Sequence, residues 1–166
     1  MNLRVGIGFD RHCFVSGKPL ILGGVEIPFR YGLLGHSDGD CLVHSVIDSL
    51  LGAANLGDIG TLFPDTDELL QGVRSLVLLE RVKDMLLSCG ANVVNLDSVV
   101  ITDKPVLREH IPAMRENISS VLGIELARVT IKGKRTEGTV PVGEDGYIDS
   151  ITVSLVELKR ECDARN

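Results

Sequence analysis

The strongest constraint on the fold is an alternation of apolar and polar residues near the end of the chain. Over 150–155 the apolar positions are Ile151, Val153 and Leu155, and the polar positions are Ser150, Thr152 and Ser154. Successive side chains of a β-strand point to opposite faces of its sheet, so this segment is predicted to be a strand. We expect its apolar face to be buried and its polar face to be open, as in a sheet covered on one side.

Four earlier segments also read as strands or a strand hairpin. Apolar residues alternate with Arg and Gly over 3–9, and this strand is expected to stop at Asp10. Two short apolar runs flank Gly23-Gly24, a pair typical of a tight hairpin turn. A β-branched strand runs over 93–101, and another begins at 129–131.

Apolar residues at helical spacing predict three helices between these strands. The first follows a cap at Ser37 or Asp38, and the others cover about 74–89 and 111–122. The stretch 57–67 contains Gly and Pro and is expected to be a polar loop. This order predicts an α+β fold, a single-domain sandwich over 1–166 with helices on one face of a mixed sheet.

Charge and composition exclude several kinds of partner. The 166 residues carry a formal charge of −6, which makes nucleic acid or an anionic membrane a poor partner. No apolar run approaches the roughly 20 residues that a membrane span needs. The start of the chain has no secretory or transit signal, and its four cysteines form no C-x-x-C pair. We therefore expect a cytoplasmic protein with reduced cysteines.

One group of residues suits a metal ion. Asp10 and His12 are two positions apart in an extended chain, so their side chains point to the same side. His44 lies in a helical row with Asp40 and Asp48. Two imidazoles and a carboxylate form a zinc triad with one open position. Taken singly, these residues also fit a surface turn and an ordinary capped helix start.

Two other segments suit phosphates and hydroxyls. Glycines and carboxylates over 57–67 allow close backbone approach to a sugar-like ligand, although a plain surface loop has the same composition. The run 132–137 offers three cations, a hydroxyl and Glu137, which suit phosphate oxygens and Mg²⁺. A solvated strand end fits the same run.

Taken together, these motifs resemble the 2-C-methyl-D-erythritol 2,4-cyclodiphosphate synthase family of the non-mevalonate isoprenoid pathway. The resemblance spans nearly the whole chain. It rests on the segments Gly8–His12, His36–Asp40 with His44, Leu51–Ala54, Gly57–Gly60, Leu62–Asp67, His110–Arg115 and Thr136-Glu137.

The resemblance implies an enzyme that performs an intramolecular phosphoryl transfer. The 2-phosphate of 4-diphosphocytidyl-2-C-methyl-D-erythritol 2-phosphate attacks the β-phosphorus of its own diphosphate, and CMP leaves. The resemblance also implies that Asp10, His12 and His44 hold Zn²⁺. Glu137 matches the ligand of a second divalent cation, Mg²⁺ or Mn²⁺.

The resemblance further implies roles for substrate-binding residues. His36 and Ser37 match positions that meet the phosphates, and His36 and Thr136 match those that act on the transition state. The family positions that hold the methylerythritol unit are matched by Asp58, Ile59, Gly60, Phe63, Pro64, Asp65, Thr66 and Asp67. The family positions that hold the cytidine diphosphate are matched by Thr102, Asp103, Lys104, Pro105, Val106, Leu107, Lys134, Arg135 and Thr136. Asp40 and Asp48 resemble residues that orient the zinc histidines without binding the metal themselves.

The family forms homotrimers with each active site shared between subunits. By the resemblance, the cytidine pocket and Glu137 come from one chain and the zinc ligands from its neighbour.

The sequence departs from the family pattern at three places. Lys134-Arg135 replaces two threonines of a Thr-Thr-Thr-Glu run, and Val106 stands where many members have Lys. The segment 140–144 ends in Glu144, where many members have an Arg that meets isoprenoid diphosphates on the trimer axis. A carboxylate there repels a diphosphate, so we expect no such binding.

Two other functions remain open at this point. A zinc-dependent phosphodiesterase or nucleotidyl hydrolase would use the same triad with water as the nucleophile. A trimeric binding module would use the metal only for stability, so that metal removal would unfold it. The length also leads us to expect no fusion with the preceding pathway enzyme.

Overall fold

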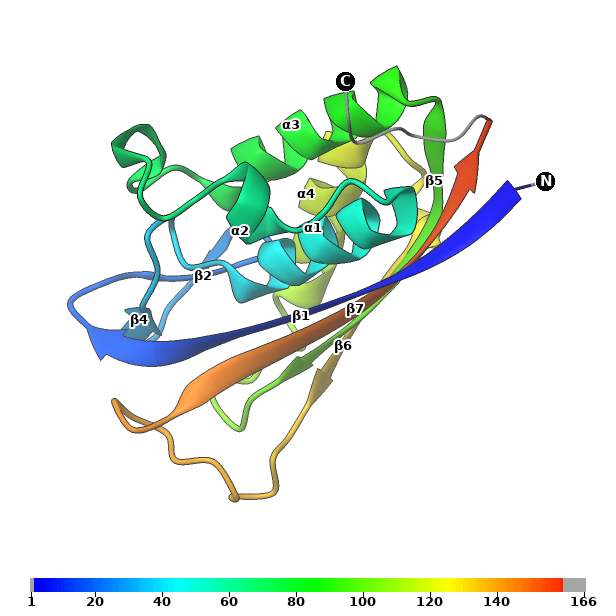
Figure 1. Ribbon diagram of the computed structural model, residues 1–166. Helices are drawn as coiled ribbons and strands as arrows, with labels where there is room; N and C mark the ends of the chain where they lie inside the picture. The colour runs from blue at the N-terminus through cyan, green and yellow to red at the C-terminus, as the bar shows by residue number, and fades with distance from the viewer. Residues whose placement is uncertain (1, 160–166) are drawn as a thin grey trace.

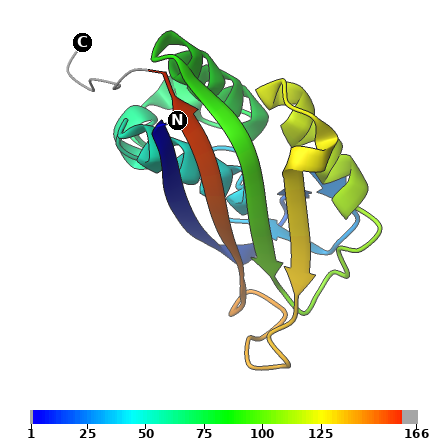
Figure 2. The same cartoon turned by 90° about the vertical axis from the view of Figure 1, so that its right-hand side faces the viewer.

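Five strands form one sheet, and the long helices cover one of its faces. The computed structural model describes residues 2–159. The strand order is β4-β1-β7-β5-β6, with only β5 and β6 parallel, so the sheet is mixed. Figure 1 shows α1, α3 and α4 on the same side of the sheet, and Figure 2 shows β1, β7, β5 and β6 side by side with the helices behind them. The predicted α+β class is confirmed.

The elements follow one another as alternating groups of strands and helices. In chain order they are β1 (Asn2–Ser16), β2 (Leu20–Leu22), β3 (Val25–Ile27), β4 (Tyr31–Leu33), α1 (Cys41–Ala54), α2 (Ile59–Leu62), the 3-10 helix η1 (Glu68–Leu70), α3 (Ser75–Ser88), β5 (Ala91–Ile101), α4 (Ile111–Leu122), the 3-10 helix η2 (Leu126–Arg128), β6 (Val129–Lys134) and β7 (Tyr147–Leu158). Among residues 2–159, no helix is long and apolar enough to cross a membrane.

Local sequence signals place several elements correctly. Gly23 and Gly24 both have positive φ and join β2 to β3, as the Gly-Gly hairpin predicts. Helix α4 ends at Gly123, whose left-handed conformation closes the helix. Helix α3 lies within one residue of its predicted bounds at each end.

Two boundaries and two short elements differ from the prediction. Strand β1 does not stop at Asp10, because it pairs with β7 as far as Cys13 and then with β4 up to Ser16. Helix α1 is capped by Asp40, whose carboxylate accepts from Val43 N–H, and not by Ser37 or Asp38. The loop over 57–67 contains the short helix α2, and the short strand β4 was not predicted.

The two faces of β7 are reversed relative to the prediction. Ser150, Thr152 and Ser154 are fully buried, whereas Val153 on the opposite face is 42% exposed. The hydroxyls of Ser150 and Thr152 each lie 2.8 Å from Ser45 Oγ on α1, so the buried polar groups are paired. The alternation identified a strand correctly, but the expectation of a buried apolar face was wrong.

Two glycines explain why the polar face is the covered one. A Cβ on Gly6 would lie 1.8 Å from the carbonyl oxygen of Ser49, and one on Gly8 would lie 2.0 Å from that of Ser45. Helix α1 therefore runs so close to β1 and β7 that only glycine and small hydroxyl side chains fit between them. Asp10 and His12 continue the same face of β1 beyond Gly8, toward the first turn of α1.

Candidate metal centre and substrate site

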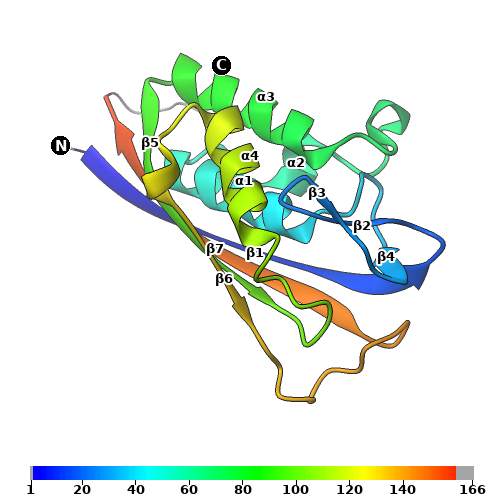
Figure 3. The ribbon, with the colours of Figure 1, turned by 180° about the vertical axis from the view of Figure 1, so that it is seen from behind.

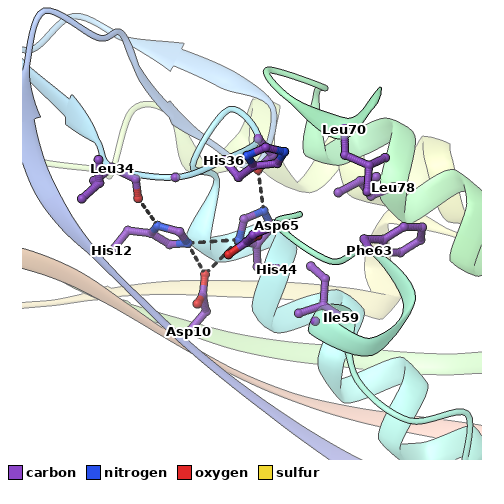
Figure 4. A pocket seen from close by; sticks show the side chains of 13 residues that line it. Asp10, His12, Leu34, His36, His44, Ile59, Phe63, Asp65, Leu70 and Leu78 are labelled. Carbon is purple, nitrogen blue, oxygen red and sulfur yellow. Dashed lines mark hydrogen bonds and ion pairs between the residues drawn. The ribbon is translucent and has the colours of Figure 1, made fainter. Parts of the chain in front are cut away.

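Asp10, His12 and His44 converge on one point between β1 and α1 (Figure 4). Asp10 Oδ2 lies 2.8 Å from His12 Nε2 and 3.0 Å from His44 Nδ1, and the two nitrogens are 3.1 Å apart. Three lone-pair atoms this close repel one another unless a proton or a metal ion lies between them. The predicted triad is therefore assembled from a strand and a helix. Its histidines, His12 and His44, are 32 residues apart in the sequence.

The outer nitrogen of each imidazole is also held in place. His12 Nδ1–H donates to the carbonyl of Leu34, which leaves Nε2 to face the cluster. His44 Nε2 lies 2.9 Å from the Ser75 hydroxyl and 3.1 Å from the Ser37 hydroxyl, which leaves Nδ1 to face the cluster. Outer partners of this kind fix the ring orientation of metal-binding histidines.

The charges in the cluster favour an ionised Asp10. Burial alone would raise its pKa, but without a metal the protonated forms of His12 and His44 donate hydrogen bonds to Asp10 and add positive charge, which outweighs burial and lowers the pKa to about 2. Burial opposes protonation of His12 as well, yet its contacts with Asp10 and the Leu34 carbonyl raise its pKa above the usual value.

This donor set fits a zinc ion. Two imidazole nitrogens and one carboxylate oxygen are ligands that Zn²⁺ prefers, and three protein ligands leave a position for an anionic oxygen. The cluster stands at the wall of a cavity of about 520 Å³, so an outside ligand can reach it. These residues therefore satisfy the chemical requirements of a catalytic metal site.

The same cavity collects several of the predicted substrate residues. Its wall includes His36 and Ser37 beside the cluster and Ile59, Gly60, Phe63 and Asp65 from the following loop. His36 Nε2–H donates to the Asp67 carbonyl at 3.0 Å, which ties this loop to the metal centre. Asp58 and Asp67 turn their carboxylates to backbone N–H groups at the starts of α2 and η1, and Pro64 and Thr66 are absent from the wall.

A second cavity of about 520 Å³ lies near the far edge of the sheet. Thr102, Asp103, Pro105, Val106, Leu107, Lys134 and Arg135 are among its lining residues, and Lys104 is not. Two strand spacings separate β1 from β5, which is about 10 Å, and β6 lies farther still. The two cavities share no lining residue. Within one chain, the predicted cytidine residues therefore lie apart from the metal cluster.

Asp103 organises the turn that carries Glu137. Its carboxylate accepts from the Thr136 hydroxyl and from the backbone N–H groups of Thr136 and Gly138. These bonds, the one from the Thr136 hydroxyl first, hold the pKa of Asp103 below its usual value. Glu137 has a φ of 54°, an unusual conformation for a residue other than glycine.

Comparison with known proteins identifies relatives over almost the full length. Residues 3–157 match the YgbB family. The chain belongs to the YgbB family. It is 54% identical to the 2-C-methyl-D-erythritol 2,4-cyclodiphosphate synthase of Neisseria gonorrhoeae over 95% of this chain and 99% of the relative. The synthase of Clostridium botulinum is 52% identical over 95% of this chain and 100% of the relative.

A solved structure of 2C-methyl-D-erythritol-2,4-cyclodiphosphate synthase in a CDP-bound form has the same fold. It matches with a TM-score of 0.85 and 36% identity, over 93% of this chain and 100% of that one. The resemblance stated from the sequence motifs is therefore confirmed, and so is the assignment of this YgbB-family chain as an enzyme of isoprenoid precursor synthesis.

Asp40 and Asp48 make no side-chain hydrogen bond with His12 or His44. Asp40 accepts from Gly23 N–H and Gly24 N–H at 2.9 and 2.7 Å, besides capping α1. Burial, followed by the charge of Asp38, raises the pKa of Asp40 to about 6. Asp48 accepts from Ile59 N–H at 2.8 Å and so joins α2 to α1. Both residues hold the loops around the site and not the imidazole rings.

The partners of the two imidazoles were missed from the sequence. Leu34 acts through its backbone carbonyl, for which no side-chain signal exists. Ser75 lies 31 residues after His44, at the first position of α3, and in the sequence it reads as an ordinary helix-start residue. Only the packing of α3 against α1 brings its hydroxyl to the ring.

Proposed function

We propose that the protein converts 4-diphosphocytidyl-2-C-methyl-D-erythritol 2-phosphate to 2-C-methyl-D-erythritol 2,4-cyclodiphosphate and CMP. An oxygen of the 2-phosphate attacks the β-phosphorus, the bond from that phosphorus to the bridging oxygen breaks, and the bridging oxygen leaves with CMP. The observation that carries this proposal is the convergence of Asp10, His12 and His44 at the wall of a cavity. The names of the relatives support the choice of substrate.

Asp10, His12 and His44 hold Zn²⁺ in this proposal, and Glu137 holds a second divalent cation, Mg²⁺ or Mn²⁺. When bound, these cations neutralise the charge of the diphosphate and polarise its β-phosphate. The low pKa of Asp10 keeps its carboxylate ionised throughout the neutral range, as a metal ligand must be.

The chain itself contributes positioning, which phosphoryl transfer needs more than a covalent nucleophile. His36 and Ser37 stand at the cavity wall beside the cluster, where they meet the phosphates. Ile59, Gly60, Phe63 and Asp65 close the same cavity around the methylerythritol unit. His36 donates to the Asp67 carbonyl, so one side chain that meets phosphate also fixes the loop.

The second cavity receives the cytidine diphosphate. Its side chains Lys134 and Arg135 supply cationic donors for phosphate oxygens, where the family has threonine hydroxyls. The Thr136 hydroxyl donates to Asp103 and accepts from Val140 N–H at 3.3 Å, so in this arrangement it holds the turn that carries Glu137 and offers no proton to a phosphate oxygen. The solved CDP-bound relative supports a nucleotide in this enzyme fold.

The chain acts as a homotrimer that brings the two cavities together across subunits. The uncovered face of β1 carries Leu3, Val5, Ile7 and Phe9, which are 47%, 70%, 70% and 53% exposed. An apolar stripe of this kind is typical of a surface that packs against other subunits. The separation of the two cavities within one chain supports an active site completed by a neighbour.

Phosphorus-31 NMR of the reaction mixture tests the proposed reaction. The protein with substrate, Zn²⁺ and Mg²⁺ should yield CMP and a coupled pair of cyclic-diphosphate resonances. His44→Ala is the matched control, because it removes one metal ligand from a helix whose core contacts remain. CMP with a linear product would instead identify a hydrolase, and no reaction by zinc-loaded protein would contradict the proposal.

A further inference from the structure

The ring of His44 is supported from behind by Ser75. Ser75 Oγ lies 2.9 Å from His44 Nε2, and Ser75 is fully buried at the first position of α3. The contact joins α1, which carries His44, to α3, which carries no residue of the triad. The first turn of α3 therefore contacts the ring of His44 through the Ser75 hydroxyl.

Asp38 fixes the direction of the hydrogen bond between Ser75 and His44. The Ser75 hydroxyl donates to Asp38 Oδ1, and the Ser75 backbone N–H donates to Asp38 Oδ2 at 3.0 Å. A serine hydroxyl has one proton, so a hydroxyl that donates to Asp38 accepts from the imidazole. The proton of the His44 ring is thereby held on Nε2, and the lone pair of Nδ1 faces Asp10 and His12.

Ser37 does not impose the same direction. Its hydroxyl is 3.1 Å from His44 Nε2, but its other contacts, with Ser75 Oγ and Gly39 N–H, are both 3.4 Å long. Within residues 2–159 no carboxylate takes the Ser37 proton, so this hydroxyl accommodates either tautomer of the ring. The difference between the two serines is the carboxylate behind Ser75.

We propose that Asp38 and Ser75 form a positioning relay that sets the tautomer and orientation of His44 for metal binding. This inference rests on the proposed metal site at Asp10, His12 and His44 and deepens it. Neither relay residue is a metal ligand, and both act through the ring of His44. Loss of such an outer partner lowers metal affinity by about 10- to 100-fold in other metal sites.

Two variants test the relay. Ser75→Ala removes the hydroxyl and leaves His44 Nε2–H with only Ser37 as a partner. Asp38→Asn keeps the shape but has one acceptor oxygen, whereas Asp38 now accepts from the Ser75 hydroxyl, Ser75 N–H and Asp40 N–H. We expect Zn²⁺ affinity, measured by competition with a chromophoric chelator, to fall about 10- to 100-fold in Ser75→Ala and by a smaller factor in Asp38→Asn.

Ser45→Ala provides a matched control. Ser45 is the next residue to His44 and its buried hydroxyl bonds Ser150 and Thr152, but not the imidazole. This variant should lower Tm and leave Zn²⁺ affinity unchanged. The visible absorption of Co²⁺-loaded protein gives a second readout: it should change in Ser75→Ala and match the wild type in Ser45→Ala.

The outcomes separate the relay from the site on which it rests. Zn²⁺ affinity of Ser75→Ala within about twofold of the wild type, with an unchanged Co²⁺ spectrum, would overturn the relay and leave the metal site intact. A wild-type protein that binds no Zn²⁺, or binds it equally well after His44→Ala, would overturn both.

Discussion

The two faces of β1 carry different parts of the function. The face under α1 holds Gly6, Gly8, Asp10 and His12, where small residues admit the helix and the polar pair follows directly after them. The opposite face holds an exposed apolar stripe that ends at Arg11. Arg11 pairs with Asp149 at 2.6 Å and stacks on Tyr147. Figure 3 shows the helices gathered on one side of the sheet only. The covered face positions the proposed metal ligands, and the open face suits the proposed assembly.

The largest loss of stability is expected when a side chain is added to a glycine on the covered face of β1. Gly8→Ala places a Cβ 2.0 Å from the Ser45 carbonyl oxygen, so α1 must move. We expect a loss of about 3 kcal/mol or more in the free energy of unfolding. Gly52→Ala is the control, since a Cβ at that position of α1 meets nothing within 4 Å. Urea unfolding should show Gly52→Ala as stable as the wild type or slightly more stable.

A charge on the open face should act on assembly and not on the fold of the chain. Ile7→Glu is expected to give a folded protein by circular dichroism that sediments as a smaller species, because a trimer would bury the new carboxylate. Leu87→Glu on α3, at a site 59% exposed, should leave the trimer unchanged. If the Ile7→Glu protein is still a trimer, the open face of β1 is not part of the subunit interface.

The metal centre on the covered face should respond to pH. A metal ligand must be deprotonated, and the pKa of His12 lies above its usual 6.5. Protons therefore compete with the metal at higher pH than for a free imidazole, so Zn²⁺ affinity should fall as pH decreases, beginning above pH 6.5. Calorimetric titrations between pH 5.5 and 8.5 measure this, and a flat profile would contradict it.

The smallest calorimetric signal is expected when an isoprenoid diphosphate is added, because we expect it not to bind on the trimer axis. Glu144 is exposed, and in a trimer three such carboxylates would repel a diphosphate on the axis. We expect no saturable binding of geranyl diphosphate by calorimetry. Saturable binding that is lost when 140–144 is altered would show this prediction to be wrong.

Local patterns predicted those features that depend on neighbouring residues. Two-residue spacing put Asp10 and His12 on one side of a strand, and Gly23-Gly24 marked a hairpin. The face of β7 that is buried was not predictable in this way. It depends on Gly6 and Gly8 meeting a helix that begins more than 30 residues later.

The same limit applies within the site. The triad members are titratable residues with typical metal-ligand spacing, so they stand out in the sequence. Ser75 and the Leu34 carbonyl reach the site only through tertiary packing, and their types are common. Asp40 and Asp48 have the helical spacing that would let them orient His44, but their carboxylates accept hydrogen bonds from backbone N–H groups instead.

Mixed trimers test whether one chain supplies the metal triad and its neighbour supplies Glu137. His44→Ala and Glu137→Ala should each be inactive as pure trimers. If sites are shared, one in four sites of a random 1:1 mixture joins an intact triad to an intact Glu137, and about a quarter of wild-type activity returns. If the mixture stays inactive although subunit exchange is verified by mass spectrometry, each site lies within one chain and the account is wrong.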